Sequence, residues 1–427
     1  MEYYEYPAQS EEVKKRLFNE GSEDPAIRSR VLDIINTVRE QGDKGVLELT
    51  RKFDGVDLAE EEMRIPEQVL EKSWNEMSEE IKSSIEIAAR RIRRFHEPQK
   101  PAGYTLEEAT GGKLEYRISP LSSVGLYVPG GTAAYPSSLL MNAIPATVAG
   151  VEKIVVVTPP GQEGNPNTSI LGTAYFLGIK EVYCIGGAQA VAALAFGTGV
   201  IPRVDKVVGP GNAYVAEAKR LLYGVIDIDM IAGPSEILVI ADETAPLSYI
   251  ISDLLSQAEH DVMAVTTLIY IGKMDREAFE KELEERVISE PRQDFIRKAL
   301  EGYGTVVEVE TSEDAVSLAN MKAPEHLEVM TKEPEKILPG LKNAGAIFVG
   351  QYTPEPVGDY VAGPNHVLPT LGTARFFSPL SVTDFMKGTS ILNLTEKDLD
   401  NLGPEAIRLA ELEGLSAHAN SIRIRLK

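Results

Sequence analysis

Residues 181–196 read Glu-Val-Tyr-Cys-Ile-Gly-Gly-Ala-Gln-Ala-Val-Ala-Ala-Leu-Ala-Phe. The β-rich run at 181–185 predicts a strand, the two glycines a tight turn, and the Ala- and Leu-rich residues 188–196 a helix. A strand, a turn and a helix in this order make one βα unit. Repetition of such units predicts a parallel sheet that is covered by helices on both faces.

The unit recurs in two sets along the chain. Further β-rich runs, separated by stretches of helix length, are residues 124–128, 153–158, 206–208, 237–240, 264–271, 305–309 and 346–349. We therefore expect an α/β fold with two open parallel sheets. Apolar residues at helical spacing predict helices in the N-terminal quarter, which we expect to complete the second sheet domain, and from about Phe385 to the end.

Composition narrows the class of protein. The 427 residues include 43 basic and 65 acidic side chains, a net charge of −22, which argues against nucleic acid and anionic membranes as partners. The first residues lack the features of a signal peptide, and no apolar run reaches transmembrane length. Cys184 is the only cysteine and cannot form an internal disulfide. These features predict a cytoplasmic protein.

Three predicted strands end in glycine turns, at residues 127–131, 186–189 and 209–212. Such turns let a ligand approach the backbone, and the following helix N-termini attract phosphate. None is a complete G-x-G-x-x-G, because Tyr214 stands where the third glycine belongs. Each could be an ordinary tight turn, but three on consecutive units favour a nucleotide-like ligand. In a fourth turn, residues 232–236, Ser235 could reach a ligand.

A predicted helix that Thr244 could cap, with Pro246 in its first turn, places Gln257 and His260 on one face. The alternative is a surface Gln and His at a helix end. Zinc accepts imidazole nitrogens and carboxylate or amide oxygens, although Gln is a rare ligand. The absence of thiolates suits a catalytic site. The candidate ligands are Gln257, His260, Asp359 and His418.

Glu325 and His326 follow Pro324. On a turn forced by the proline, a carboxylate and an imidazole can act together as two general acid/base groups. The alternative is a Glu at a helix start beside a surface His. The basic run at residues 90–94 is interpreted as a solvated face, and His96 as a loop residue.

With these motifs assembled, the chain resembles the histidinol dehydrogenase family over almost its whole length. The matching segments are residues 127–131, 186–190, 208–212, 232–236, 257–261, 323–328, 358–370 and 413–418. The resemblance implies two incomplete Rossmann-like parallel-sheet domains with small helical N- and C-terminal parts. The expected parts are residues 1–23, a discontinuous domain of 24–121 and 240–380 that carries most metal and catalytic residues, an inserted domain of 122–239, and a C-terminal part of 381–427.

The resemblance also implies roles for single residues. Zinc, one ion per subunit, would be bound by Gln257, His260, Asp359 and His418, and Glu325 and His326 would be the acid/base pair. NAD would contact Tyr127, Gln189 and Asn212. Substrate contacts would come from Ser235, Gln257, His260, His326, Asp359, His366, Glu413 and His418. Family members are homodimers, so Glu413 and His418 would complete the partner's site.

The implied reaction is the four-electron oxidation of L-histidinol to L-histidine through L-histidinaldehyde with two NAD, the last steps of histidine biosynthesis. Three alternatives remain open at the level of sequence. One is a relative with the same site that oxidises another small hydroxy compound. Another is a zinc hydrolase in which Glu325 activates water. The last is a non-catalytic binding protein on an α/β scaffold.

Overall fold

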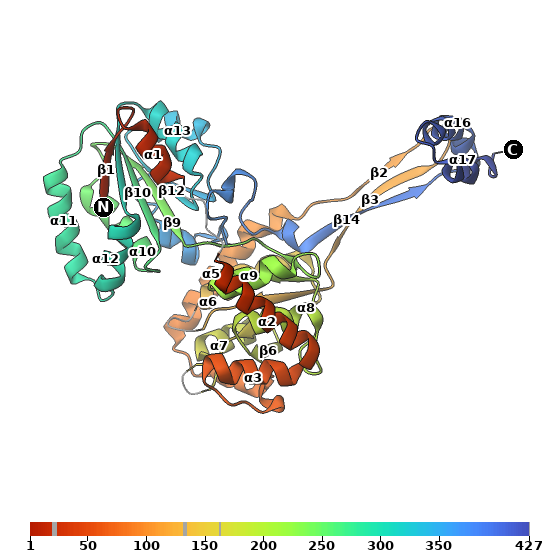
Figure 1. Ribbon diagram of the computed structural model, residues 1–427, viewed down its shortest axis with the longest axis horizontal. Helices are drawn as coiled ribbons and strands as arrows, with labels where there is room; N and C mark the ends of the chain where they lie inside the picture. The colour runs from red at the N-terminus through yellow and green to blue at the C-terminus, as the bar shows by residue number, and fades with distance from the viewer. Residues whose placement is uncertain (19–23, 131–134, 162–163, 427) are drawn as a thin grey trace.

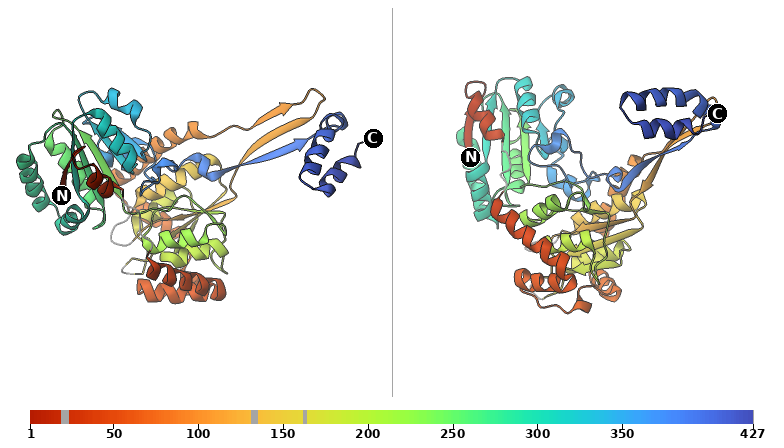
Figure 2. Two further views of the ribbon diagram at one scale, coloured as in Figure 1. Left: turned by 45° about the horizontal axis from the view of Figure 1, so that its top comes forward. Right: turned by 45° about the vertical axis from the view of Figure 1, so that its right-hand side comes forward.

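The computed structural model describes residues 1–18, 24–130, 135–161 and 164–426; Gly131 of the first glycine turn lies outside these ranges. Two α/β bodies lie next to each other, and a long arm projects away from both (Figure 1). The views in Figure 2 show the same arm extending away from both bodies, with the C-terminus at its tip. The α/β fold class predicted from the repeated βα units is confirmed.

The first body contains a five-stranded parallel sheet in the order β6-β5-β4-β7-β8. Alternate residues of its strands face opposite helical layers, as expected for a sheet that is buried on both sides. The strands are β4 (Ser123–Tyr127), β5 (Lys153–Thr158), β6 (Glu181–Cys184), β7 (Lys206–Val208) and β8 (Asp227–Ile228). One layer is α4 (Glu67–Asn75), α5 (Glu79–His96), α6 (Pro136–Ala149) and α7 (Thr168–Phe176). The other is α2 (Pro25–Gln41), α3 (Asp43–Asp54), α8 (Gly187–Phe196) and α9 (Ala213–Leu222).

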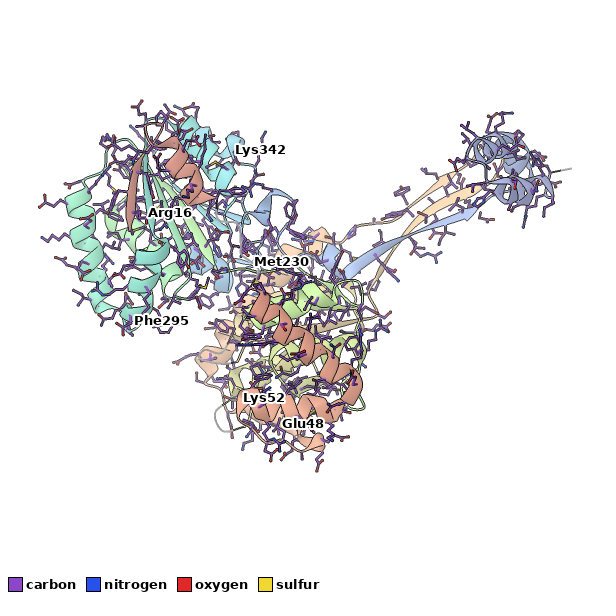
Figure 3. The ribbon with its side chains drawn as sticks, in the orientation of Figure 1. Arg16, Glu48, Lys52, Met230, Phe295 and Lys342 are labelled. Atoms are coloured by element: carbon purple, nitrogen blue, oxygen red, sulfur yellow. The ribbon has the colours of Figure 1, made fainter. Side chains whose placement is uncertain are left out.

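The second body contains a six-stranded parallel sheet in the order β1-β11-β10-β9-β12-β13. Its strands are β1 (Glu2–Glu5), β9 (Glu236–Ala241), β10 (Val265–Ile271), β11 (Thr305–Val309), β12 (His326–Met330) and β13 (Ala346–Val349). One face packs on α10 (Leu247–Ala258), α11 (Arg276–Ser289) and α12 (Gln293–Tyr303). The other packs on α1 (Ser10–Leu17), α13 (Ser312–Lys322) and α14 (Pro334–Ile337). Met230, on the segment between β8 and β9, lies where the chain passes from one body to the other (Figure 3).

The arm is an antiparallel sheet of β2 (Tyr104–Glu107), β3 (Lys113–Pro120) and β14 (Met386–Asn393), with α16 (Glu396–Leu412) and α17 (Ser416–Arg423) at its end (Figure 1). Residues 386–393 are therefore a strand, where the sequence analysis expected helix. Thr395 caps α16 by accepting a hydrogen bond from the backbone N–H of Asp398 at 3.2 Å. Pro404 lies inside α16.

The packing of the N-terminal quarter differs from the expected grouping. Helices α2 to α5 cover the five-stranded sheet, and among the first residues only β1 and α1 join the six-stranded sheet. The apolar stripe of α2, which includes Val31, Ile34 and Val38, packs on α8 and α9. Apolar spacing identifies the buried face of a helix, but it carries no information about which of two sheets that face meets. The division into domains stays a prediction.

Two further local expectations were wrong. Helix α10 begins at Leu247 with Pro246 as its N-cap, and the side chain of Thr244 does not cap it. His96 is fully buried at the end of α5, where its Nδ1 lies 2.8 Å from the carbonyl of Ile92. Among the described helices, none combines the length and apolarity needed to span a bilayer.

Candidate active site

The acid/base residues predicted from the sequence lie at the amino edge of the six-stranded sheet. Glu325 immediately precedes β12, and His326 is its first residue. The neighbouring strand β9 begins at Glu236, and His326 pairs with Ile237 in the parallel register. In this sheet the chain order reverses between β9 and β12. Ligands usually bind at the carboxyl edge of such a reversal; here the reactive side chains gather at the opposite edge.

The backbone of Glu236 holds both members of the pair. Its N–H donates to Glu325 Oε2 at 2.9 Å, and its carbonyl accepts from His326 Nδ1 at 3.1 Å. A carbonyl can only accept a hydrogen bond, so Nδ1 carries the proton and the lone pair of the neutral imidazole is on Nε2. Both side chains are buried, at 6% and 3% exposure. Their orientation is therefore fixed by main-chain groups.

Carboxylates surround the free nitrogen of His326. Nε2 has no hydrogen-bond partner among the described residues, and it lies 3.7 Å from Glu355 Oε1 and 3.7 Å from Asp359 Oδ1. Burial alone would lower the pKa of His326, but the carboxylates of Glu325, Asp359 and Glu355 raise it to about 10. Burial raises the pKa of Glu325 to about 7, against the lowering effect of His326. Displaced pKa values of this kind suit groups that exchange protons.

Three of the four predicted metal ligands lie on the second body. Gln257, at the end of α10, and His260, just beyond it, approach each other, with Gln257 Nε2 and His260 Nδ1 3.1 Å apart. Burial lowers the pKa of His260, while the nearby Asp359 carboxylate opposes that change. Gln257 Oε1 is buried without a hydrogen-bond partner among the described residues. A carboxamide oxygen left unsatisfied beside an imidazole and a carboxylate fits a borderline cation such as zinc.

His418 and Glu413 lie elsewhere. Glu413 directly follows α16 and His418 is on α17, both exposed at the end of the arm and far from the two bodies (Figure 1). The four-residue ligand set therefore stays a prediction. A different group of potential ligands is assembled within the chain, since donor atoms of His326, Glu355 and Asp359 lie within 4.8 Å of one another.

The predicted cofactor residues share the carboxyl edge of the five-stranded sheet. Tyr127 ends β4, Gln189 lies in the first turn of α8 after β6, and Asn212 caps α9 after β7. The chain order of this sheet reverses between β4 and β7, so Tyr127 and Asn212 flank a topological switch point, the usual place for a nucleotide. The Tyr127 hydroxyl accepts from the N–H of Gly187 at 3.1 Å.

A close backbone approach shapes this edge. Gly209 has φ +114°, and a Cβ there would stand 2.2 Å from the carbonyl oxygen of Tyr127. Only glycine fits, because any side chain would collide with the neighbouring strand. The turn after β7 is thereby held directly against the end of β4.

Hydrogen bonds connect the segment that carries Asp359 to a helix of the other body. His366 Nδ1 donates to the carbonyl of Asp359 at 2.9 Å, which leaves His366 Nε2 to accept from the hydroxyl of Ser138 at 3.3 Å. Ser138 lies in the first turn of α6, the helix that follows the carboxyl end of β4. The segment that carries Asp359 therefore touches the body that carries the cofactor residues. Ser235, partly exposed, immediately precedes β9 at the same junction.

Some supporting residues were missed by sequence reasoning. Arg91, from the basic run that was interpreted as a solvated face, donates to the carbonyls of Val361 at 2.7 Å and Ala362 at 3.1 Å, and so holds the turn that carries Asp359. Behind His326, the buried carboxyl of Glu328 lies beside that of Asp253 and accepts a hydrogen bond from the N–H of Glu355 at 2.8 Å. The sequence signal for Glu328 was its place two residues after His326, on the same face of a strand. No such signal marked Arg91.

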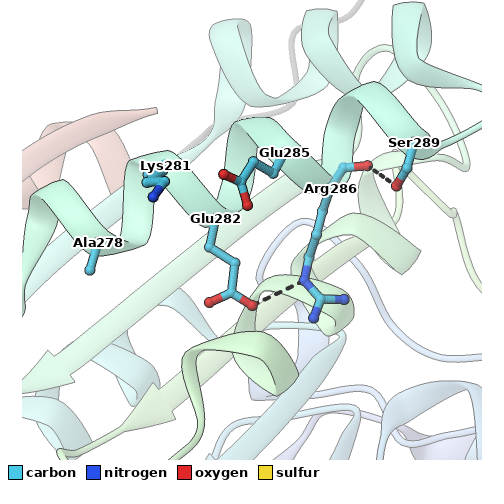
Figure 4. Close-up of a pocket in the computed structure, with 6 residues that line it drawn as sticks. All are labelled: Ala278, Lys281, Glu282, Glu285, Arg286 and Ser289. Atoms are coloured by element: carbon cyan, nitrogen blue, oxygen red, sulfur yellow. Dashed lines mark hydrogen bonds and ion pairs between the residues drawn. The ribbon is translucent and has the colours of Figure 1, made fainter.

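The hollow in Figure 4 lies away from this site. It is formed by one face of α11 and holds the Glu282–Arg286 ion pair at 3.2 Å. None of the predicted site residues lines it. It reflects side-chain spacing on an exposed helix, and we assign it no role.

Comparison with known proteins decides between the readings that the sequence left open. The family model for histidinol dehydrogenase matches residues 18–426. This chain belongs to the histidinol dehydrogenase family. The histidinol dehydrogenase of Caldanaerobacter subterraneus subsp. tengcongensis is 51% identical over 403 residues, which cover 94% of this chain and 93% of that protein. The histidinol dehydrogenase of Aquifex aeolicus is 48% identical over 92% of this chain and 91% of its own.

A solved structure agrees with these relatives. The crystal structure of histidinol dehydrogenase from Elizabethkingia anophelis superposes with a TM-score of 0.92 at 35% identity, covering 100% of this chain and 98% of the other. The histidinol dehydrogenase family membership makes this chain an oxidoreductase of histidine biosynthesis, and the family is consistent with the use of NAD. The resemblance stated from the sequence motifs is confirmed.

The buried carboxyl of Glu328 predicts a pH-dependent stability. Burial and the adjacent Asp253 raise the pKa of Glu328 above the usual 4.5, so the folded state binds this proton more tightly than the unfolded state does. The resulting stabilisation is complete below pH 4.5 and is lost as the pH rises towards the folded pKa. Glu328→Gln should remove this dependence. Each unit by which folding raises the pKa of Glu328 corresponds to about 1.4 kcal/mol of stabilisation at low pH.

The measurement is the free energy of unfolding of EDTA-treated protein between pH 5 and pH 9. The free energy of unfolding of Glu328→Gln should increase relative to that of the wild type as the pH rises. That of the exposed control Glu335→Gln should change with pH in the same way as the wild type. Parallel curves for Glu328→Gln and the wild type would show that Glu328 is ionised throughout.

Proposed function

We propose that this chain oxidises L-histidinol to L-histidine through L-histidinaldehyde, reducing two NAD, with one zinc ion bound in each subunit. The observation that carries the proposal is that Glu325 and His326 are both hydrogen-bonded to the backbone of one residue, Glu236, and that His326 lies beside Asp359. The segment that carries Asp359 contacts the other body through His366, which bonds to the Asp359 carbonyl and to the Ser138 hydroxyl. In this proposal one site would combine acid/base groups, metal ligands and a nucleotide-binding edge.

The metal ligands of this proposal are Gln257, His260 and Asp359, completed by His418 from a second copy. The bound ion would act as a Lewis acid that orients the imidazole and amino group of the substrate and gathers charge around the reacting carbon. Ser235, His366 and the partner-supplied Glu413 would bind the rest of the substrate. NAD would contact Tyr127, Gln189 and Asn212 and would accept one hydride in each step.

The protein's own residues move the protons. Zinc bound by Asp359 would offset part of the carboxylate charge that raises the pKa of His326, and the neutral imidazole would then accept the hydroxyl proton of histidinol at Nε2, because Nδ1 is committed to the Glu236 carbonyl. The neighbouring carboxylates would stabilise the imidazolium that forms. Glu325, held by the Glu236 N–H, would deprotonate the water that hydrates the aldehyde. Because both side chains are buried, the aldehyde would stay shielded from bulk water between the two steps.

The exposed arm supports a dimer with shared sites. Among the described residues of α16 and α17, only Asp398, Gly403 and Ala419 are buried. Several large apolar side chains there are open to solvent, at 52% for Leu402, 61% for Leu409, 83% for Leu412 and 79% for Ile424. Two helices with so few buried residues and so many exposed apolar side chains need a second surface to cover them. A second copy of the chain would supply such a surface, and Glu413 and His418 would then complete the site of that copy.

Substitution of Glu325 tests the division of labour within the pair. Glu325→Gln keeps the size of the side chain but removes the base that activates water. Oxidation of added histidinaldehyde should fall by about 10²–10⁴-fold, and oxidation of histidinol to the aldehyde should fall much less. Single-turnover NADH formation from each substrate measures the two steps. Equal losses in both steps would contradict the assignment of water activation to Glu325.

Mixed dimers test whether sites are shared. Glu325→Gln damages the body of a site and His418→Asn its arm. If arms are exchanged, a heterodimer of the two variants contains one intact site, so a randomly reassembled mixture should recover about a quarter of the wild-type histidine formation. The control mixture, Glu325→Gln with His326→Asn, carries both lesions in the body and should recover nothing. No recovery in the first mixture would mean that the arm serves its own subunit.

A further inference from the structure

A buried ion pair stands directly behind the acid/base residues. Lys322 is the last residue of α13 and Glu236 the first of β9. The Lys322 ammonium contacts Glu236 Oε2, and the two side chains are only 5% and 1% exposed. The function proposed above uses the backbone of Glu236 but neither of these two side chains. The pair links the start of one strand to the segment that leads into the next.

This position matters because the ion pair links two segments, one that binds the acid/base side chains and one that carries them. Glu236 supplies the peptide groups that bind Glu325 and His326. Lys322 begins the connection that ends in Glu325, after Ala323 in the left-handed region at φ +52° and Pro324. A non-glycine residue in that region is strained and persists only when its surroundings hold it. The Lys322–Glu236 contact is such a restraint.

The same connection is held from its other side. The N–H of Gly345 donates to the carbonyl of Pro324 at 2.9 Å, and the N–H of Ala346 donates to the carbonyl of Glu325 at 2.9 Å. A Cβ at Gly345 would stand 2.5 Å from the Glu325 carbonyl oxygen, so β13 packs tightly against this backbone. The backbone of Glu325 is thus fixed by β13, while its carboxylate is fixed by Glu236.

We propose that Lys322 and Glu236 are positioning residues, whose ion pair sets the Glu236 peptide at the distance and angle at which it aligns both Glu325 and His326. The inference rests on the function proposed above. A buried ion pair is a weak source of stability, because the cost of desolvating two charges offsets their attraction. The contribution of this ion pair is to fix the position of the Glu236 backbone. Loss of alignment should therefore damage both chemical steps together, unlike the loss of Glu325 alone.

The other sheet provides a matched control. Lys219 and Asp229 form a second buried ion pair, at 3% and 1% exposure. Lys219 Nζ donates to the carbonyl of Gly209 at 3.0 Å, and the N–H of Gly209 donates to Asp229 Oδ2 at 2.8 Å. This pair is hydrogen-bonded to the turn beside Asn212 and does not contact the acid/base residues. Its removal carries the same kind of folding cost but should raise the KM for NAD.

The test is the double variant Glu236→Gln/Lys322→Met, which leaves no unpaired buried charge. Its thermal unfolding midpoint should stay close to that of the wild type. Its kcat with zinc and saturating NAD should fall by about 10–100-fold, the scale of a misplacement of about 1 Å. Oxidation of histidinol and of histidinaldehyde should fall by similar factors. The control Lys219→Met/Asp229→Asn should instead show its main effect on the KM for NAD.

A folded double variant with wild-type kcat would overturn the inference, as would a loss confined to one of the two steps. If the double variant does not fold, Glu236→Asp decides, because it keeps the charge while drawing the carboxylate back by one methylene. A wild-type kcat for Glu236→Asp would overturn the inference, and a fall in both steps would support it. A wild-type protein that does not oxidise histidinol would contradict the proposed function itself, independently of these variants.

Discussion

The active site depends on the two hydrogen bonds made by the peptide groups of Glu236. A backbone N–H and a backbone carbonyl from one residue bind Glu325 and His326, so these side chains are oriented by the pairing of β9 with β12. Sheet register is a stiff constraint, since a shift of one residue would turn every side chain of the strand to the other face. The fold therefore delivers the acid/base pair to one defined place.

This constraint explains why the chemistry lies at an unusual edge. Parallel sheets normally bind ligands at their carboxyl edge, and the predicted cofactor residues Tyr127 and Asn212 lie at that edge of the five-stranded sheet. The six-stranded sheet presents its amino edge at the junction of the two bodies. Two sheets meeting in this way bring the proposed cofactor edge of one towards the acid/base residues of the other. The His366–Ser138 hydrogen bond spans that junction.

Much of the fold followed from the sequence, because short apolar runs with glycine turns encode parallel strands locally. Strand β12 was not predicted, because it begins within the motif that was interpreted as a turn after Pro324. The strands of the arm were missed, although β2 and β3 alternate apolar and polar residues as strands do; the run that forms β14 has no such alternation, and the faces of all three strands are largely exposed. Contacts such as Arg91 with the carbonyl of Val361 join residues 270 positions apart, and no local pattern records them.

The central claim is that one site carries out both oxidations without losing the aldehyde. The most direct measurement is the amount of NADH formed for each L-histidinol consumed, with zinc-supplied wild-type protein and excess NAD. The account predicts two NADH with L-histidine as the product. One NADH for each histidinol, with the aldehyde in solution, would contradict it, since Glu325 and His326 would then not act on the same bound molecule.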